Sequence, residues 1–497
     1  MKKEHSKKCN RERNQKDSKK CDPKQNKKYN KGSGQERKRN EAEKKHTVNT
    51  RALVLDMLLE SESGQKYANV IVRETLAKYD YLTAREKAFI KRLFEGCVEY
   101  RIQLDHLLNA FSNTKTTKMK PVILQILRMS VYQLLYMDAV PDSAACNEAV
   151  ALAGLRGFGG LKGFVNGVLR NIARNKSALP MPDMKREPVT ALSVRYAMPE
   201  WLVCMFCEIY GIGTTQKMLA AMLEESPVTV RMDERLGLDE QEQILGQMRQ
   251  KGIRVEQHPY LTYAYRLFDV DGIANAPGFE DGAYYVQDVS SMLVSEAAGI
   301  RKGMHILDLC AAPGGKSLHA AEKLCGTGLV ESRDLTEYKV AMIEENRMRC
   351  HCDNLIVKQQ DACVLCEEDI GQFDVVYADV PCSGLGIMGK KCDIRHRIQP
   401  DQIEELVVLQ RKIIEQACRY VKDGGVLIYS TCTINPSENE RQLSYITSCG
   451  LVLESLDPYL PDELCGGTAR QGYLQLLPGI HETDGFFLAR FRKRVDI

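Results

Sequence analysis

Residues 306–316 read ILDLCAAPGGK, a short apolar run followed by a glycine-rich turn and the start of a segment with helical spacing. The apolar run predicts a buried strand, and a strand that turns into a helix is typical of α/β folds. Gly314 and Gly315 would let the backbone approach a ligand closely, and the N-terminus of the helix favours an anionic group such as an amino-acid carboxylate. A purely structural turn would use glycine as well.

Four further apolar runs follow, and helical segments separate them. They lie at 328–333, 355–360, 373–378 and 426–429. Strands that alternate with helices indicate a doubly wound, mostly parallel sheet, so we predict an α/β, Rossmann-like domain over 286–497. A last run at 485–491 is expected to return antiparallel.

Polar residues that suit chemistry come directly after these runs. They are Cys310, Asp334, Asp361, Asp379 and Cys432. Ligands of open α/β sheets bind in the crevice outside the carboxyl ends of the strands. We therefore expect these side chains to converge on one pocket.

The glycine turn does not match the common nucleotide-binding motifs. A phosphate-binding P-loop needs glycine five positions before Gly315, where the chain has Cys310, and the turn lacks the pattern G-x-G-x-x-G. An adenosyl ligand with an amino-acid end remains as the natural candidate. Asp334 lies twenty positions after Gly314, close to where dinucleotide-binding folds place a ribose-binding acid, and Asp361 would then serve the adenine.

Cys382 and Cys432 both follow apolar runs. A cysteine thiolate can act as a covalent nucleophile. Together with the cofactor turn, the two thiols predict an enzyme that attacks a nucleobase. Two buried, inert cysteines are the structural alternative, and the residues alone leave open which thiol attacks.

The N-terminal third of the chain contains a charged tail and a helical region. Residues 1–46 hold 18 Lys and Arg against 7 Asp and Glu and few apolar residues, which predicts a disordered basic tail that attracts phosphate groups. Residues 47–175 carry apolar residues at i, i+3, i+4 and i+7, so we predict an all-helical domain.

Residues 176–285 are predicted to form a proline-marked linker and a small α+β module. The expected helices lie at 196–222 and 239–250, and the expected strands lie at 227–231, 253–256 and 262–268.

A cytosolic protein without a membrane span is expected. The apolar stretch 121–140 is interrupted by four polar residues and has helical spacing, so it predicts a core helix. Because no export signal precedes the body of the chain, its 18 cysteines are expected to be thiols. We also expect the protein to be a monomer.

One group of cysteines has the residue types of a zinc site. Cys350, Cys352, Cys363 and Cys366 surround a predicted strand, with His351 between the first two. Their spacing matches no common zinc module, so no metal is expected.

Three segments resemble motifs I, IV and VI of the RNA cytosine-5 methyltransferases, the Sun family. They are 308–316, 379–384 and 429–433. Residues 147–153 and 164–170 are similar to the end of the NusB-like domain found in one branch, the bacterial 16S ribosomal RNA methyltransferases. The resemblance covers the chain from about residue 47 to its end, including 484–489. It implies a NusB-like, RNA-binding domain over 47–175 and a methyltransferase domain over 286–497.

The resemblance also implies S-adenosylmethionine as cofactor and C5 of a cytosine in 16S ribosomal RNA as methyl acceptor. It makes Cys432 the nucleophile that adds to C6, Cys382 a residue that assists product release, and Asp379 a contact of both cytosine and cofactor. The residues implied to contact the cofactor are Cys310, Ala311, Ala312, Pro313, Gly314, Gly315, Lys316, Asp334, Asp361 and Asp379.

Two other functions fit the same sequence. One is the same chemistry on transfer RNA or 23S ribosomal RNA, and the other is a non-catalytic RNA-binding factor for ribosome assembly. The intact cysteines and glycine turn favour an enzyme. A basic stretch after the Cys382 loop is either a solvated loop or part of the RNA-binding surface, and it contains Lys390, Lys391, Arg395 and Arg397.

Overall fold

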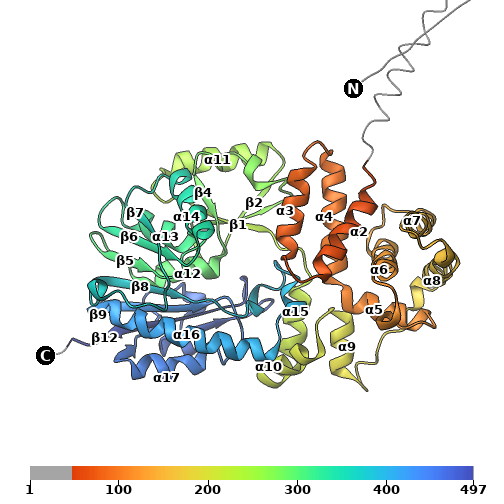
Figure 1. Ribbon diagram of the computed structural model, residues 1–497. Helices are drawn as coiled ribbons and strands as arrows, with labels where there is room; N and C mark the ends of the chain where they lie inside the picture. Colours follow the sequence, from red (N-terminus) through yellow and green to blue (C-terminus); the bar gives the residue numbers. More distant parts are fainter. Residues whose placement is uncertain (1–47, 496–497) are drawn as a thin grey trace, which may run out of the picture. The chain divides into compact units, whose positions relative to one another are not determined.

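The computed structural model describes residues 48–495, so the predicted basic tail at 1–46 lies outside the described residues. The described chain contains a helical region, a small antiparallel sheet with its helices, and a larger mixed sheet covered by helices (Figure 1). This is the predicted fold class, with an all-helical part and a small α+β module before an α/β domain.

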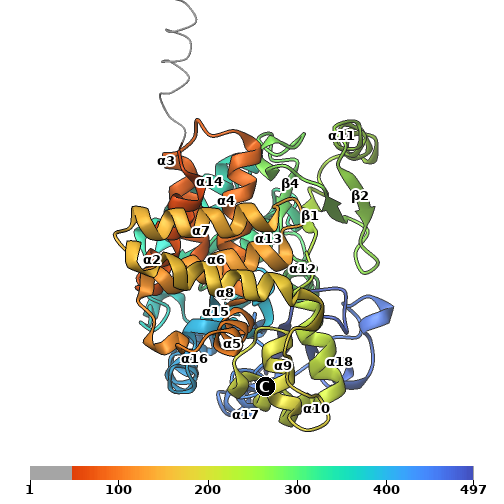
Figure 2. The same ribbon diagram turned by 90° about the vertical axis from the view of Figure 1, so that its right-hand side faces the viewer.

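Within residues 48–174, seven α-helices form the described part of the N-terminal region, as the apolar spacing predicted. They are α2 (Thr50–Glu62), α3 (Ala68–Lys78), α4 (Ala84–Glu99), α5 (Arg101–Phe111), α6 (Pro121–Tyr136), α7 (Asp142–Leu155) and α8 (Lys162–Arg174). Helix α6 begins with proline, whose fixed φ suits the first helical position. It packs against α2, α4, α5, α7 and α8, and Figure 2 shows α7 and α8 beside it. The stretch 121–140 is therefore a core helix, as predicted, and no helix within 48–495 is long and apolar enough to cross a bilayer.

The α+β module begins with two helices that connect it to the N-terminal region. Its elements are α9 (Pro188–Arg195), α10 (Glu200–Ala221), β1 (Val228–Met232), α11 (Leu238–Gln250), β2 (Arg254–Gln257), β3 (Ala264–Phe268) and β4 (Tyr284–Val286). The strands form an antiparallel sheet in the order β2-β3-β1-β4. The sequence predicted β1, β2 and β3 but missed β4, because three residues are too few to show a period.

The larger sheet has the predicted mostly parallel topology, with the order β10-β12-β9-β8-β5-β6-β7 and β11 paired to β12. Its parallel strands are β5 (His305–Asp308), β6 (Leu329–Asp334), β7 (Leu355–Gln359), β8 (Phe373–Asp379) and β9 (Val421–Thr431). The antiparallel strands are β10 (Leu451–Leu453), β11 (Tyr473–Leu476) and β12 (Phe486–Lys493). The helices are α12 (Val289–Ala298), α13 (Gly315–Lys323), α14 (Glu337–Arg349), α15 (Ile394–Arg397), α16 (Pro400–Tyr420), α17 (Glu440–Ser448) and α18 (Gly467–Arg470).

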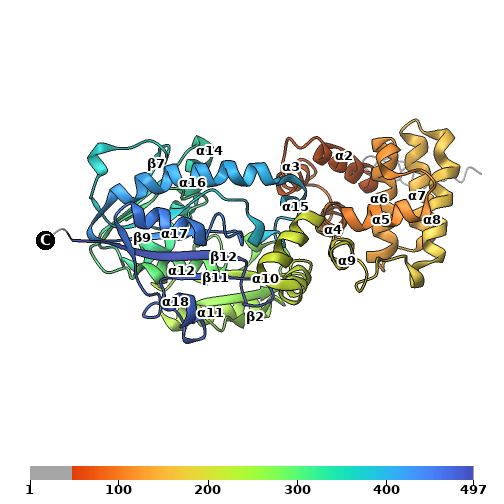
Figure 3. The ribbon, with the colours of Figure 1, turned by 90° about the horizontal axis from the view of Figure 1, so that it is seen from below.

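Hydrophobic layers cover both faces of this sheet because successive strand residues point to opposite faces. Ile306 packs in a core with residues of α12 and α13, whereas Leu307 packs in a second core with residues of α16 and α17. Figure 3 shows α16 and α17 on one side of β9 and β12, with α12 on the other. The chain runs outward from β5 in both directions, so the switch point lies between β5 and β8, where α/β sheets bind ligands.

Candidate active site

The two predicted cysteines lie side by side at the ends of neighbouring strands. Strands β8 and β9 are parallel and in register, with Asp379 opposite Ser430. The chain therefore places Cys382, three residues beyond β8, next to Cys432, the first residue beyond β9. Their sulfur atoms are 3.3 Å apart.

The environment makes the two thiols unequal. A hydrogen bond from the Cys382 thiol, supported by the nearby Lys391 and Lys316, lowers the pKa of Cys432 although burial and Asp379 oppose this. The same hydrogen bond, together with burial and the charge of Glu438, raises the pKa of Cys382 well above its ordinary value. The two shifts therefore favour Cys432 as the thiolate and Cys382 as the hydrogen-bond donor.

Lys316 and Asp379 form an ion pair at the carboxyl end of β8. The Lys316 ammonium donates to one Asp379 oxygen at 2.7 Å, and the Ser430 hydroxyl donates to the other oxygen at 2.7 Å. Burial acts to lower the pKa of Lys316, but the charge and hydrogen bond of Asp379 outweigh it and the pKa is raised. The ion pair fixes the Lys316 and Asp379 side chains close to the thiols.

A pocket of about 510 Å³ opens at the switch point. Its wall on the large sheet consists of Asp308, Cys310, Ala311, Ala312, Pro313, Gly315, Lys316 and Asp379. Residues of β1 and β4 form the facing wall. Gly314 has a φ of 109°, a left-handed conformation that glycine adopts without strain, and it caps the N-terminus of α13 beside the pocket. A Cβ on Gly315 would come within 3.0 Å of the Tyr285 ring.

Asp308 was not predicted as a site residue, yet it is the buried acid of this pocket. One oxygen accepts from the Ser317 hydroxyl at 2.6 Å, and the other, Oδ1, has no hydrogen-bond partner. Burial raises its pKa to about 7. The sequence signal that could have identified Asp308 is its position at the end of the strand before the glycine turn.

The structure places three predicted cofactor residues outside the lining of this pocket: Gly314, Asp334 and Asp361. Asp334 is buried, and its carboxylate accepts from the backbone of Ala312 at 3.0 Å and pairs with Lys339 at 2.9 Å, so it holds the turn in place. Asp361 is exposed and accepts from the Cys363 backbone at 2.9 Å.

A buried glutamate joins the two cysteine loops. Glu438 accepts from the backbone N–H and the hydroxyl of Ser383 at 2.8 and 2.5 Å. Gln410 donates to Glu438 at 3.0 Å and also to the Pro381 carbonyl at 3.0 Å. Sequence reasoning missed Ser383, Gln410 and Glu438 as positioning residues, because their partners are distant in the chain.

Glu438→Ala is expected to lower the free energy of unfolding by about 3 kcal/mol, because it leaves buried donors of Ser383 and Gln410 unpaired. The thermal midpoint measures this effect. Glu440→Ala is the matched control, since it makes the same truncation at a nearby glutamate whose Oε2 has no hydrogen-bond partner. Equal thermal midpoints for the two variants would contradict the role of Glu438 in holding the two cysteine loops together.

The basic stretch after Cys382 is mostly engaged within the protein. Lys390 lies between Asp288 at 2.9 Å and Asp484 at 2.7 Å, and Arg395 is 1% exposed. The hypothesis that Arg395 contributes to an RNA-binding surface is therefore wrong. Lys391 is exposed and lines the 510 Å³ pocket.

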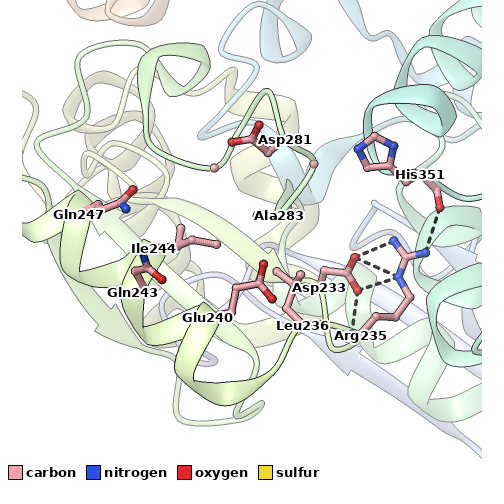
Figure 4. A pocket seen from close by; sticks show the side chains of 12 residues that line it. Asp233, Arg235, Leu236, Glu240, Gln243, Ile244, Gln247, Asp281, Ala283 and His351 are labelled. Atoms are coloured by element: carbon pink, nitrogen blue, oxygen red, sulfur yellow. Dashed lines mark hydrogen bonds and ion pairs between the residues drawn. The ribbon is translucent and has the colours of Figure 1, made fainter.

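The cysteines with zinc-like residue types are separated by the sheet. Cys350 and Cys352 belong to one hydrophobic core, and Cys363 and Cys366 pack against the other. His351 lies apart in a pocket of about 480 Å³ (Figure 4). Within 48–495 no group of three or more His, Cys, Asp or Glu side chains could hold a metal ion.

That pocket is lined by α11, the segment after β1 and the turn before β4, and none of its residues lines the 510 Å³ pocket. Asp233 and Arg235 form an ion pair in it at 2.6 Å, and Arg235 donates to the carbonyl of His351 at 3.1 Å (Figure 4). These contacts join the small sheet to the end of α14.

Three family models match successive parts of the chain. The NusB family matches 48–174, a ferredoxin-like domain of RsmF/B-like methyltransferases matches 198–269, and the 16S rRNA methyltransferase RsmB/F family matches 298–492.

Curated proteins match over most of their length. The probable ribosomal RNA small subunit methyltransferase B of Bacillus subtilis is 35% identical over 451 residues, which cover 90% of this chain and 99% of that protein. The ribosomal RNA small subunit methyltransferase B of Escherichia coli (strain SMS-3-5 / SECEC) is 30% identical over 437 residues, which cover 87% and 96%.

Solved structures share the fold. The crystal structure of PH0851 matches with a TM-score of 0.74 and 22% identity, covering 90% of this chain and all of that one. NSun6 from Pyrococcus horikoshii, solved with SFG, matches with a TM-score of 0.52 and 21% identity, covering 59% of this chain and 97% of that one.

Proposed function

Because this chain belongs to the RsmB/F family of 16S rRNA methyltransferases, we propose that it methylates C5 of a cytosine in 16S ribosomal RNA through a covalent cysteine adduct. The observation that carries the proposal is the pair of thiols 3.3 Å apart at neighbouring strand ends, beside Lys316 and Asp379. A pocket that needed only to bind RNA would not require two thiols of opposite pKa shift next to an ion pair.

The pocket fits S-adenosylmethionine, the proposed cofactor. An ammonium group suits the unpartnered Oδ1 of Asp308, and a carboxylate suits the N-terminus of α13, with residues 310–316 around this amino-acid end. Asp334 and Asp361 remain proposed contacts of the adenosyl end, with Asp334 using oxygen lone pairs that its backbone partners leave free. When bound, this cofactor supplies an electrophilic methyl group on a sulfonium.

Binding of the amino-acid end should depend on pH. At pH 7.5 Asp308 is mostly ionised, and at pH 6.0 it is mostly protonated, because its pKa is about 7. We expect S-adenosylhomocysteine, which has the same amino-acid end, to bind about tenfold more weakly at pH 6.0, measured by calorimetry. The raised pKa has the opposite effect on the unliganded fold, whose stability falls as the pH rises from 3.8 to about 7.

The Asp308→Asn variant provides the control for this pH effect. It should bind S-adenosylhomocysteine weakly and equally at both pH values, since the amide does not titrate. A wild-type affinity that is the same at pH 6.0 and 7.5 would exclude Asp308 as the partner of the ammonium.

The residues of the chain then have distinct roles. The Cys432 thiolate adds to C6 of the cytosine, which makes C5 nucleophilic enough to be methylated. Asp379, held in place by Lys316, accepts a hydrogen bond from the amino group of the base. After methylation, a water molecule takes the proton from C5, the electrons of that C–H bond form the C5=C6 double bond, and the C6–S bond breaks with its electron pair returning to sulfur. Cys382 donates a hydrogen bond to that departing sulfur.

Because the reaction uses C5 and C6 of the ring, the target base must leave its stack. This costs least for a nucleotide in a loop. A single-stranded or loop cytosine of structured RNA is therefore the proposed substrate.

The direct test is transfer of labelled methyl groups to unmodified 16S transcript, followed by mapping of 5-methylcytosine. We expect one modified cytosine in 16S RNA. Transfer to 23S or transfer RNA instead would correct the substrate. Tight binding of 16S RNA without transfer to any of the three RNAs would replace the proposal with an assembly factor.

A further inference from the structure

A second cavity opens onto the cysteine pair. Its volume is about 700 Å³, its wall includes Cys382 and Ser383, and none of its residues lines the 510 Å³ pocket. The other walls come from the loop between α2 and α3, from α15 and from the first half of α16. They consist of Gly64, Tyr67, Ile394, His396, Arg397, Ile398, Gln402, Glu405, Leu406 and Leu409. The cavity is therefore mostly apolar and adjoins a catalytic thiol.

The aromatic side chain of Tyr67 lines this cavity, and contacts with α15 hold the backbone around it. Tyr67 is 54% exposed, and the guanidinium of Arg397 lies 4.3 Å from the centre of its ring. Arg397 donates to the carbonyls of Gly64 and Lys66, and Asp393 accepts from the backbone N–H of Ala68 at 2.9 Å. The backbone on both sides of Tyr67 is thus tied to α15 and the turn before it. The guanidinium covers one face of the ring, while more than half of Tyr67 stays exposed.

Two charged side chains line the cavity, Arg397 and Glu405, and Arg397 also lies 3.5 Å from Asp393. Burial lowers the pKa of His396 to about 3, so this imidazole is neutral, and its Nε2 lies 2.8 Å from the Val98 carbonyl. A single guanidinium beside an aromatic ring suits one phosphate and one base. It does not suit a duplex, whose backbone needs several cations along its length.

We propose that this cavity binds the nucleotide next to the target cytosine in a single-stranded segment of RNA, with its base stacked on Tyr67. The proposal rests on the function proposed above, because its location at Cys382 is meaningful only if a base reaches Cys432. Stacking on an aromatic ring tolerates any base, while Gln402 and Glu405 offer polar groups that can discriminate between base edges. The cavity then holds the strand while the neighbouring base enters the site of the thiols.

The test compares Tyr67→Ala with Tyr67→Phe and with Tyr81→Ala. Tyr81 is the matched control, because it is a tyrosine of the same helical region with 55% exposure and does not line the cavity. The expected result is that Tyr67→Ala raises both the Kd and the KM for unmodified 16S transcript about tenfold or more. Tyr67→Phe, which keeps the ring, and Tyr81→Ala should stay within about twofold of wild type, the scatter expected without loss of a stacked base.

Two further readouts separate this proposal from the proposed function. The affinity for S-adenosylhomocysteine should be unchanged in Tyr67→Ala, since Tyr67 does not line the cofactor pocket. Ultraviolet crosslinking of 4-thiouridine-substituted 16S transcript should label the peptide that contains Tyr67. A wild-type Kd in Tyr67→Ala, with crosslinks elsewhere, would overturn the stacking site while methyl transfer by the wild type still supported the enzyme. Crosslinking at Tyr67 without any methyl transfer would support RNA binding in this cavity and overturn the proposed enzymatic function.

Discussion

Replacing Cys432 with alanine is expected to abolish methyl transfer, by at least about 10³-fold, and to abolish covalent trapping of RNA that contains 5-fluorocytidine. The thiolate is the group that makes C5 of cytosine nucleophilic, and the neighbouring Cys382 cannot replace it because its pKa is raised. Release of the RNA requires that C5 lose its substituent as a proton, and fluorine cannot leave in that way. The wild type should therefore stay covalently bonded to such RNA. A denaturing gel detects the bonded species.

Cys204→Ala is the control for general effects of losing a thiol, because Cys204 is exposed on α10. It should trap and methylate as the wild type does. Trapping that survives in Cys432→Ala would mean that another thiol attacks the base. Cys382 would be the first candidate.

Much of the large sheet could be predicted because its signals are local. Each parallel strand is a short apolar run, and Asp379 and Cys432 follow two such runs directly, so the rule for strand ends placed them at one edge. The same rule placed Asp334 at this edge of the sheet, but it could not reveal that the residue lies outside the pocket lining, where its carboxylate accepts from Ala312 and pairs with Lys339.

The features that the sequence did not reveal depend on distant contacts. Glu438 lies in a polar segment with no periodic pattern, and its role appears only when Ser383 and Gln410 come within 3.0 Å. The contact of Arg397 with the carbonyl of Gly64 joins residues that are 333 positions apart. Strand β10 has three residues and exists because β12 pairs with it.

Replacing Cys382 with alanine should have the opposite effect on trapping from Cys432→Ala. The two sulfur atoms are 3.3 Å apart, and the directions of their pKa shifts favour Cys382 as the donor to the Cys432 sulfur, which is the atom that must leave C6 with its electron pair. Without this donor the departing thiolate is less stable, so elimination slows more than methylation. We expect turnover to fall about 10²-fold or more, as when a single hydrogen-bond donor to a developing negative charge is removed. A covalent complex with ordinary, unfluorinated RNA should accumulate.

Three companion variants define how Cys382 acts. Cys382→Ser keeps a donor next to Cys432, so it should turn over faster than Cys382→Ala and accumulate less complex. The double variant Cys382→Ala, Cys432→Ala should form no complex, because the complex depends on the Cys432 sulfur. Glu438→Ala loosens the loop that carries Cys382 without removing the thiol, and should give a smaller accumulation than Cys382→Ala. If Cys382→Ala turned over normally and left no complex on a denaturing gel, the hydrogen bond between the two thiols would have no part in product release.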